Sequence, residues 1–155
     1  MSEHFRKWQP YGAATLVGSL PHHDRQRAID LVFEEVGEIP AWPQLSSYTS
    51  EQMLVQYNEG LPGLDRQNDR ILLFTVSDPG FEQELLAFYE EYLPASNGEL
   101  SLDESRFRFG ADTGRTFFAF LERLQRQQPT AAAVKGQITG PFTLLTALKD
   151  EHGQL

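Results

Sequence analysis

Cysteine is absent from this sequence of 155 residues. Without thiols the chain can form neither a disulfide framework nor a thiolate metal site of its own. No apolar run approaches the roughly 20 residues that a membrane-spanning helix needs. The N-terminal stretch, residues 1–12, is polar and lacks the apolar segment of a secretory leader. These absences predict a soluble, cytoplasmic protein that does not enter a membrane.

Basic residues are also scarce, with 13 Lys and Arg against 22 Asp and Glu, which gives a net charge of −9. Nucleic-acid binding requires a basic face that neutralises phosphates, so this balance argues against it. The chain is well supplied with apolar residues: 40% of its residues are hydrophobic and 12% are aromatic. Such a composition is typical of a folded chain, and its length predicts a single domain over residues 1–155.

Apolar periodicity and turn residues predict an alternation of strands and helices along the chain. Asp24 is placed to cap a helix that Gly37 ends, and Asp78 with Pro79 forms a similar start for a helix that Pro94 ends. We expect strands at 13–18, 41–44 and 131–138, a hairpin at 64–74, and helices at 25–36, 49–57, 79–93, 113–127 and from 141. Residues 95–111 are polar and without periodicity, which predicts a loop or insertion.

This order predicts the α/β fold class, with a parallel sheet joined by right-handed crossovers. Three buried strands are too few for a complete doubly wound sheet. They are also too few for an eight-stranded barrel, which typically takes about 250 residues. The third strand would then leave one edge of the sheet open, and an open edge is a ready template for pairing with another chain.

Ligands of parallel α/β proteins bind at the carboxyl ends of the strands. Three stretches, "VGSLPHHD", "AWPQLS" and "GQITGP", stand at such ends. Their candidate ligand-binding residues are Gly18, Ser19, His22, Trp42, Gln44, Gln137 and Thr139. Each has an alternative interpretation. Gly18 and Ser19 fit a simple turn with a capping serine, His22 fits a surface or capping role better than a metal ligand, and Trp42 fits the core.

Lys135 stands in the middle of the third predicted strand. Strand alternation places Lys135, Gln137 and Thr139 on one face, with Gly136 on the opposite face, where a helix can pack close. A buried ammonium needs a carboxylate partner. We therefore expect Lys135 to form a structural ion pair with another strand rather than to act as a catalytic base.

The stretches "VGSLPHHD", "IPAWPQLS", "LPGL" and "VKGQITGPFTLL" together resemble the N-terminal half of the cobalamin-independent methionine synthase-like proteins. That family belongs to the uroporphyrinogen decarboxylase and methionine synthase superfamily of (βα)8 TIM barrels. The resemblance extends over residues 14–148, and its most specific motif is Lys-Gly, two residues, then Thr-Gly-Pro. It implies a partial TIM barrel: about three βα units with a hairpin and helical insertion.

The resemblance implies a methyltransferase of methionine biosynthesis, which transfers a methyl group from a methylated folate or a corrinoid protein to a thiol such as homocysteine. In that family a zinc ion holds the acceptor sulfur as a thiolate. The roles of the family's Gly-Ser pair imply that Gly18 and Ser19 contact the amino-acid substrate. Trp42 and Gln44 stand in the segment that lines the family's site, although Pro43-Gln44 replaces an acidic residue there.

The zinc ligands of the family come from later strands, so the resemblance implies no metal ligand, no cofactor and no catalytic residue within this chain. We expect a truncated barrel, half of a split protein or a fragment, completed by a second polypeptide that brings zinc. The alternative is a non-catalytic module that binds a small molecule or self-associates as a homodimer through its open strand edge. A third possibility is an inactive remnant of marginal stability.

Overall fold

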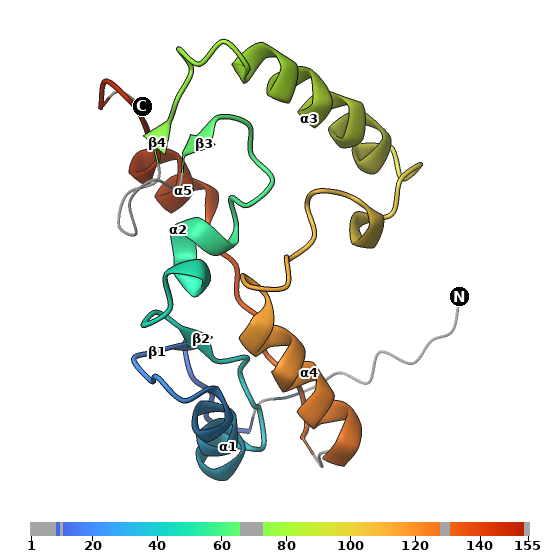
Figure 1. Cartoon of the computed structure of the whole chain (residues 1–155). Helices are drawn as coiled ribbons and strands as arrows, with labels where there is room; N and C mark the ends of the chain where they lie inside the picture. Colours follow the sequence, from blue (N-terminus) through green and yellow to red (C-terminus); the bar gives the residue numbers. More distant parts are fainter. Residues whose placement is uncertain (1–8, 10, 66–72, 128–130, 154–155) are drawn as a thin grey trace.

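The computed structural model describes residues 9, 11–65, 73–127 and 131–153 of the chain. The fold is mixed α/β and mostly helical, with a small parallel sheet (Figure 1). Its helices are α1 (Arg25–Val36), η1 (Thr49–Glu51), α2 (Met53–Gln56), α3 (Phe81–Ser96), η2 (Leu102–Glu104), α4 (Arg115–Gln127) and α5 (Pro141–Ala147). Its strands are β1 (Ser19–Leu20), β2 (Gln44–Leu45), β3 (Leu64–Asp65), β4 (Leu73–Phe74) and β5 (Lys149–Asp150).

Strands β1 and β2 pair in parallel, with Ser19 opposite Gln44. Residues 131–139 lie along the other side of the second strand segment. There Ala41 and Lys135 form a parallel bridge, with hydrogen bonds from Trp42 N to Lys135 O at 3.1 Å and from Lys135 N to Pro40 O at 3.0 Å. The three segments predicted as parallel strands therefore lie side by side in chain order.

The parallel strands pair over far fewer residues than the sequence predicted. The first strand forms at Ser19–Leu20 instead of 13–18, because Gly18 takes a φ of +123° that interrupts an extended run. The third segment has a single bridge instead of a strand over 131–138. Pro40 and Pro43 have no backbone N–H to donate to the ladder. The Trp42 carbonyl accepts a hydrogen bond from the Gln137 side chain, through Nε2, at 2.9 Å, instead of from a backbone N–H of the third segment.

The hydrophobic core lies between this sheet and helices α1 and α4, which cover one of its faces. Helix α1 begins and ends as predicted, with the Asp24 carboxylate accepting a hydrogen bond from Arg27 N at 3.0 Å. Burial of the apolar face of each helix provides the main driving force for this packing. The central buried side chains are Ile29, Val32, Val36, Trp42 and Phe120.

A second, three-stranded sheet has the order β3-β4-β5. Strands β3 and β4 are antiparallel, which confirms the hairpin predicted over 64–74, while its turn at 66–72 lies outside the described residues. The sequence did not predict β5, which pairs in parallel with β4. Strand β5 follows α5, whose first residue is Pro141 as expected.

The remaining predicted bounds are partly wrong. The helix expected over 49–57 is divided into η1 and α2 at Gln52. Helix α3 starts two residues after Pro79, and Pro94 lies inside its last turns instead of ending it. The expected loop at 95–111 therefore includes the end of α3, and it also contains η2.

Among the described residues, no helix is both long and apolar enough to cross a membrane.

Candidate functional site

A cleft of about 440 Å³ opens at the carboxyl ends of the three parallel segments. It brings together four of the predicted ligand-binding residues, Ser19, Gln44, Gln137 and Thr139. The segment between β2 and the hairpin supplies most of the other lining residues, which are not among the predicted ligand-binding residues. The complete lining is Val17, Ser19, Gln44, Ser46, Gln52, Met53, Leu54, Tyr57, Gln137, Ile138 and Thr139.

Gln137 is held at the base of this cleft against the first strand segment. Its Nε2 donates to the Trp42 carbonyl at 2.9 Å, and its Oε1 is buried with no hydrogen-bond partner. A Cβ at Gly18 would clash with the Gln137 amide group. Glycine is therefore required at position 18 both by the close approach of Gln137 and by the positive φ. Gly18 and Gln137, each predicted to contact a ligand, contact each other.

Two further polar side chains of the cleft, Gln44 and Thr139, are also held by hydrogen bonds. Gln44 is 6% exposed, and its Nε2 donates to Gln56 Oε1 at 2.8 Å. Gln56 in turn donates to the Thr113 carbonyl just before α4. Thr139 Oγ1 donates to the Met53 carbonyl at 3.2 Å. Because these groups are held in place before any ligand arrives, less side-chain entropy is lost on binding.

Tyr57 joins the short helix α2 to the third parallel segment. Its hydroxyl donates to the Gln137 carbonyl at 2.7 Å, and burial raises the pKa of Tyr57 to about 12. The tyrosine therefore stays neutral at physiological pH. None of the lining residues carries a formal charge at that pH, and the lining includes apolar side chains such as Met53 and Ile138. Such a cleft suits a small ligand with an apolar part and a few polar groups.

Two predicted residues lie away from the cleft. Trp42 is 4% exposed and packs in the core against Phe109 and Phe117, at ring-centroid distances of 5.5 and 4.8 Å. Its alternative interpretation as a core residue is the one that fits the structure. His22 accepts a hydrogen bond from the Ser47 hydroxyl through its main-chain carbonyl, and it does not line the cleft.

Lys135 does not form the expected ion pair with any residue that the structure describes. Its ammonium donates to the Val17 carbonyl at 2.7 Å, immediately before Gly18. Because the side chain remains partly exposed, its charge is partly solvated and does not need a buried carboxylate. Gly136 was expected to admit a helix, but no atom lies within 4 Å of a Cβ placed there.

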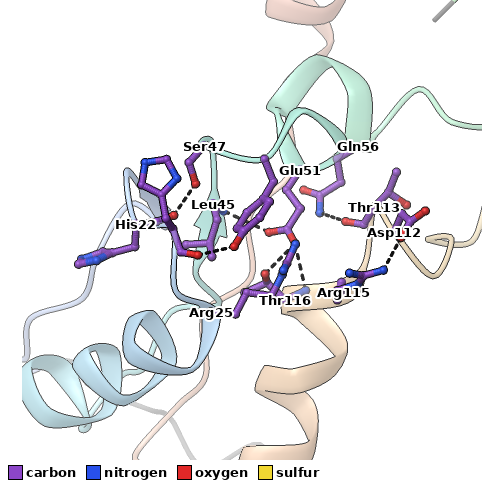
Figure 2. Close-up of polar contacts among 12 residues, drawn as sticks. His22, Arg25, Leu45, Ser47, Glu51, Gln56, Asp112, Thr113, Arg115 and Thr116 are labelled. Atoms are coloured by element: carbon purple, nitrogen blue, oxygen red, sulfur yellow. Dashed lines mark hydrogen bonds and ion pairs between the residues drawn. The ribbon is translucent and has the colours of Figure 1, made fainter. Parts of the chain in front are cut away.

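A buried carboxylate, that of Glu51, connects the elements around the cleft. Glu51 of η1 is fully buried, and it accepts hydrogen bonds from Thr116 Oγ1 at 2.7 Å, Thr116 N at 3.2 Å and Leu45 N at 3.3 Å (Figure 2). Arg25 Nε pairs with it at 3.3 Å, and the guanidinium stacks on Tyr48. No sequence pattern singled out Glu51. The available signal was its place in the connection that follows the second strand, since βα connections line the rim of the sheet.

The described residues do not fit a zinc ion. They contain no group of three or more His, Asp or Glu side chains placed to hold a metal, and the whole sequence lacks cysteine. Comparisons of the chain with protein-family models, with curated proteins and with solved structures found no match. The resemblance to methionine synthase-like proteins therefore depends on the sequence motifs alone.

Proposed function

We propose that this chain forms the substrate-binding rim of a methionine synthase-like methyltransferase with a TIM-barrel architecture. The observation that carries the proposal is that Ser19, Gln44 and Thr139, from three successive parallel segments, line one cleft. The segments follow each other in the order expected for the first βα units of such a barrel. Under this proposal the protein acts in the cytoplasm.

The proposed role of the chain is to bind and orient the small-molecule thiol and its methyl donor. The uncharged side chains of Gln137 and Thr139 provide hydrogen-bonding groups, and Met53 and Ile138 provide an apolar wall. Because the described residues do not fit a metal, we assign no chemical step to them. A second polypeptide would supply the metal and the rest of the barrel.

Titration of the isotope-labelled full chain with homocysteine and methionine, monitored by NMR, tests this role. We expect weak, zinc-independent binding that shifts the side-chain amide signals of Gln44 and Gln137. The variant Thr139→Val should weaken binding, whereas Thr143→Val, on an exposed position of α5, should leave it unchanged. Unshifted amide signals would contradict the proposal, and so would tight zinc-dependent thiol binding by the chain alone.

A second candidate function is self-association through the open strand edge. Lys135 uses its backbone N–H and C=O toward Pro40 and Trp42, so the backbone groups of Val134, Gly136 and Ile138 point to the other edge. The side chains of Val134 and Ile138 are 51% and 78% exposed. A stable homodimer in light scattering, broken by Ile138→Asp, would favour this assembly module over a methyltransferase part.

A further inference from the structure

Helix α3 differs from α1 in its packing, because none of its 16 residues is buried. One of its sides carries Phe88 and Tyr92, whose rings lie 5.5 and 6.3 Å from the ring of Phe107. The neighbouring side of the helix carries Leu86, Tyr89 and Leu93, which are 61%, 47% and 55% exposed. The Tyr89 ring also lies 5.4 Å from Phe88 and 6.2 Å from Tyr92. The spacing of Leu86, Tyr89 and Leu93 by three and four residues places these three side chains, the α3 stripe, along one line of the helix.

A helix with so wide an apolar face normally buries that face against other elements. In this molecule that face contacts Phe107 and is otherwise largely exposed, and Figure 1 shows α3 at the periphery, apart from α1 and α4. Three large apolar side chains in one line on a peripheral helix are more than the scattered single exposures of an ordinary surface. The α3 stripe is therefore a candidate docking surface.

The charges around the stripe indicate what covers it. Helix α3 contains four glutamates and neither lysine nor arginine. Glu91 pairs with Arg106, and Glu84 accepts a hydrogen bond from Gly63 N. Glu82 stands one turn before Leu86 and Glu90 directly follows Tyr89; both are exposed. Within the described part of the chain, neither takes part in an ion pair, so both are available to a cationic partner.

We propose that the α3 stripe binds a basic amphipathic helix of another protein. Leucine-type side chains of that helix would pack between Leu86, Tyr89 and Leu93, and its flanking lysines or arginines would pair with Glu82 and Glu90. A second copy of this chain fits poorly. It would bring the same glutamates of two molecules together, each molecule with a net charge of −9.

The probe for this proposal is a helical peptide of leucine and lysine, with leucines spaced by three and four residues. The same peptide with glutamate in place of lysine is its control. NMR signals of Leu86, Tyr89 and Leu93 in the full chain should shift with the lysine peptide and not with the glutamate peptide. Added salt should weaken the interaction, because its charged rim is exposed.

Two matched variants distinguish binding at the α3 stripe from non-specific hydrophobic binding. Leu86 and Leu102 are both 61% exposed, but Leu102 belongs to η2 and lies outside the stripe. We expect Leu86→Ser to lower the affinity about tenfold, as for a central interface side chain, and Leu102→Ser to change it less than about twofold. Circular dichroism checks that both variants fold.

Three results would overturn the proposal. Equal binding of the glutamate peptide would show that charge does not select the partner. An equal loss in the Leu102→Ser and Leu86→Ser variants would show that the peptide binds without regard to the stripe. A homodimer of the unmodified chain that Leu86→Ser dissociates would assign the surface to a second copy.

Discussion

Close approach at one glycine decides the geometry of the cleft. The Gln137 amide occupies the space where any other residue at position 18 would place its Cβ. The same amide reaches the Trp42 carbonyl, so Gln137 of the third parallel segment contacts both the first and the second segment. At the residue scale, the geometry of the cleft therefore requires both the Gln137 side chain and the lack of a Cβ at Gly18.

Gly18→Ala should destabilise the protein by roughly 1–3 kcal/mol, because alanine is strained at a φ of +123° and its Cβ displaces Gln137. Urea unfolding measures the change. The matched control is Gly136→Ala, where a Cβ meets no atom within 4 Å and a loss below about 0.5 kcal/mol is expected. Equal losses in the two variants would show that the contact with Gln137 has no energetic importance.

Tyr57 predicts a pH dependence at the alkaline end. Its folded pKa of about 12 lies above the ordinary value of 10.0, because burial disfavours the charged phenolate. The stabilisation from neutral Tyr57 is therefore complete below pH 10 and is lost as the pH rises from 10 toward 12. In an absorbance titration of the folded chain, one tyrosine should ionise late, and Tyr57→Phe should remove that late step. A titration unchanged by Tyr57→Phe would contradict this assignment.

At the scale of elements, Glu51 joins four pieces of secondary structure. Its carboxylate contacts the N-terminal turn of α4, the backbone of β2 and the Arg25 side chain of α1, while Glu51 itself belongs to η1. Carboxylates near helix N-termini are stabilised by the free N–H groups there. The position of α4 against the sheet thus depends on one acidic side chain.

Glu51→Ala should cost about 3 kcal/mol, because the buried donors of Thr116 and Leu45 would lose their acceptor. Glu51→Gln should cost less, since its amide oxygen still accepts hydrogen bonds. Thermal and urea unfolding measure both variants, and Glu35→Ala, on the exposed face of α1, is the control. A loss no larger than that of the control would show that Glu51 is not a structural centre.

At the scale of the whole molecule, the second sheet joins strands that are far apart in the sequence, since β5 pairs with β4. Glu151 makes one of the longest connections in the chain, accepting hydrogen bonds from Val76 N at 3.1 Å and Ser77 N at 3.0 Å. This link closes the small sheet, because it ties the turn after β5 to the segment that follows β4.

Glu151 predicts a pH dependence at the acid end. Hydrogen bonds from its own backbone amide, from the Ser77 hydroxyl, and from the amides of Val76 and Ser77 lower the pKa of Glu151 to about 2. The stabilisation is therefore present above pH 4.5 and is lost as the pH falls toward 2. Hydrogen-exchange protection of the Val76 and Ser77 amides should fall between pH 6 and pH 3 in the unmodified chain.

The variant Glu151→Gln should show lower protection at these amides at pH 6, with little further change at pH 3. The control Glu99→Gln changes an exposed acid elsewhere and should behave as the unmodified chain. Protection that is independent of pH in the unmodified chain would show that the carboxylate does not hold this connection.

Much of the element order could be predicted because it depends on local signals. The Asp24 cap defined α1, Pro141 defined the start of α5, and turn residues defined the hairpin of β3 and β4. The lengths of the parallel strands could not be predicted, because Gly18 takes a left-handed φ and the Gln137 side chain replaces a ladder hydrogen bond. Both depend on neighbours that are far away in the sequence.

The sequence by itself determined which residues stand at the ends of the parallel segments, since strand alternation and helix caps act over a few residues. It thereby selected Ser19, Gln44, Gln137 and Thr139. The tertiary structure alone decided that Trp42 belongs to the core, that Glu51 and Tyr57 support the cleft, and that Lys135 bonds to a carbonyl. These outcomes depend on burial and on contacts between distant segments, which no local pattern encodes.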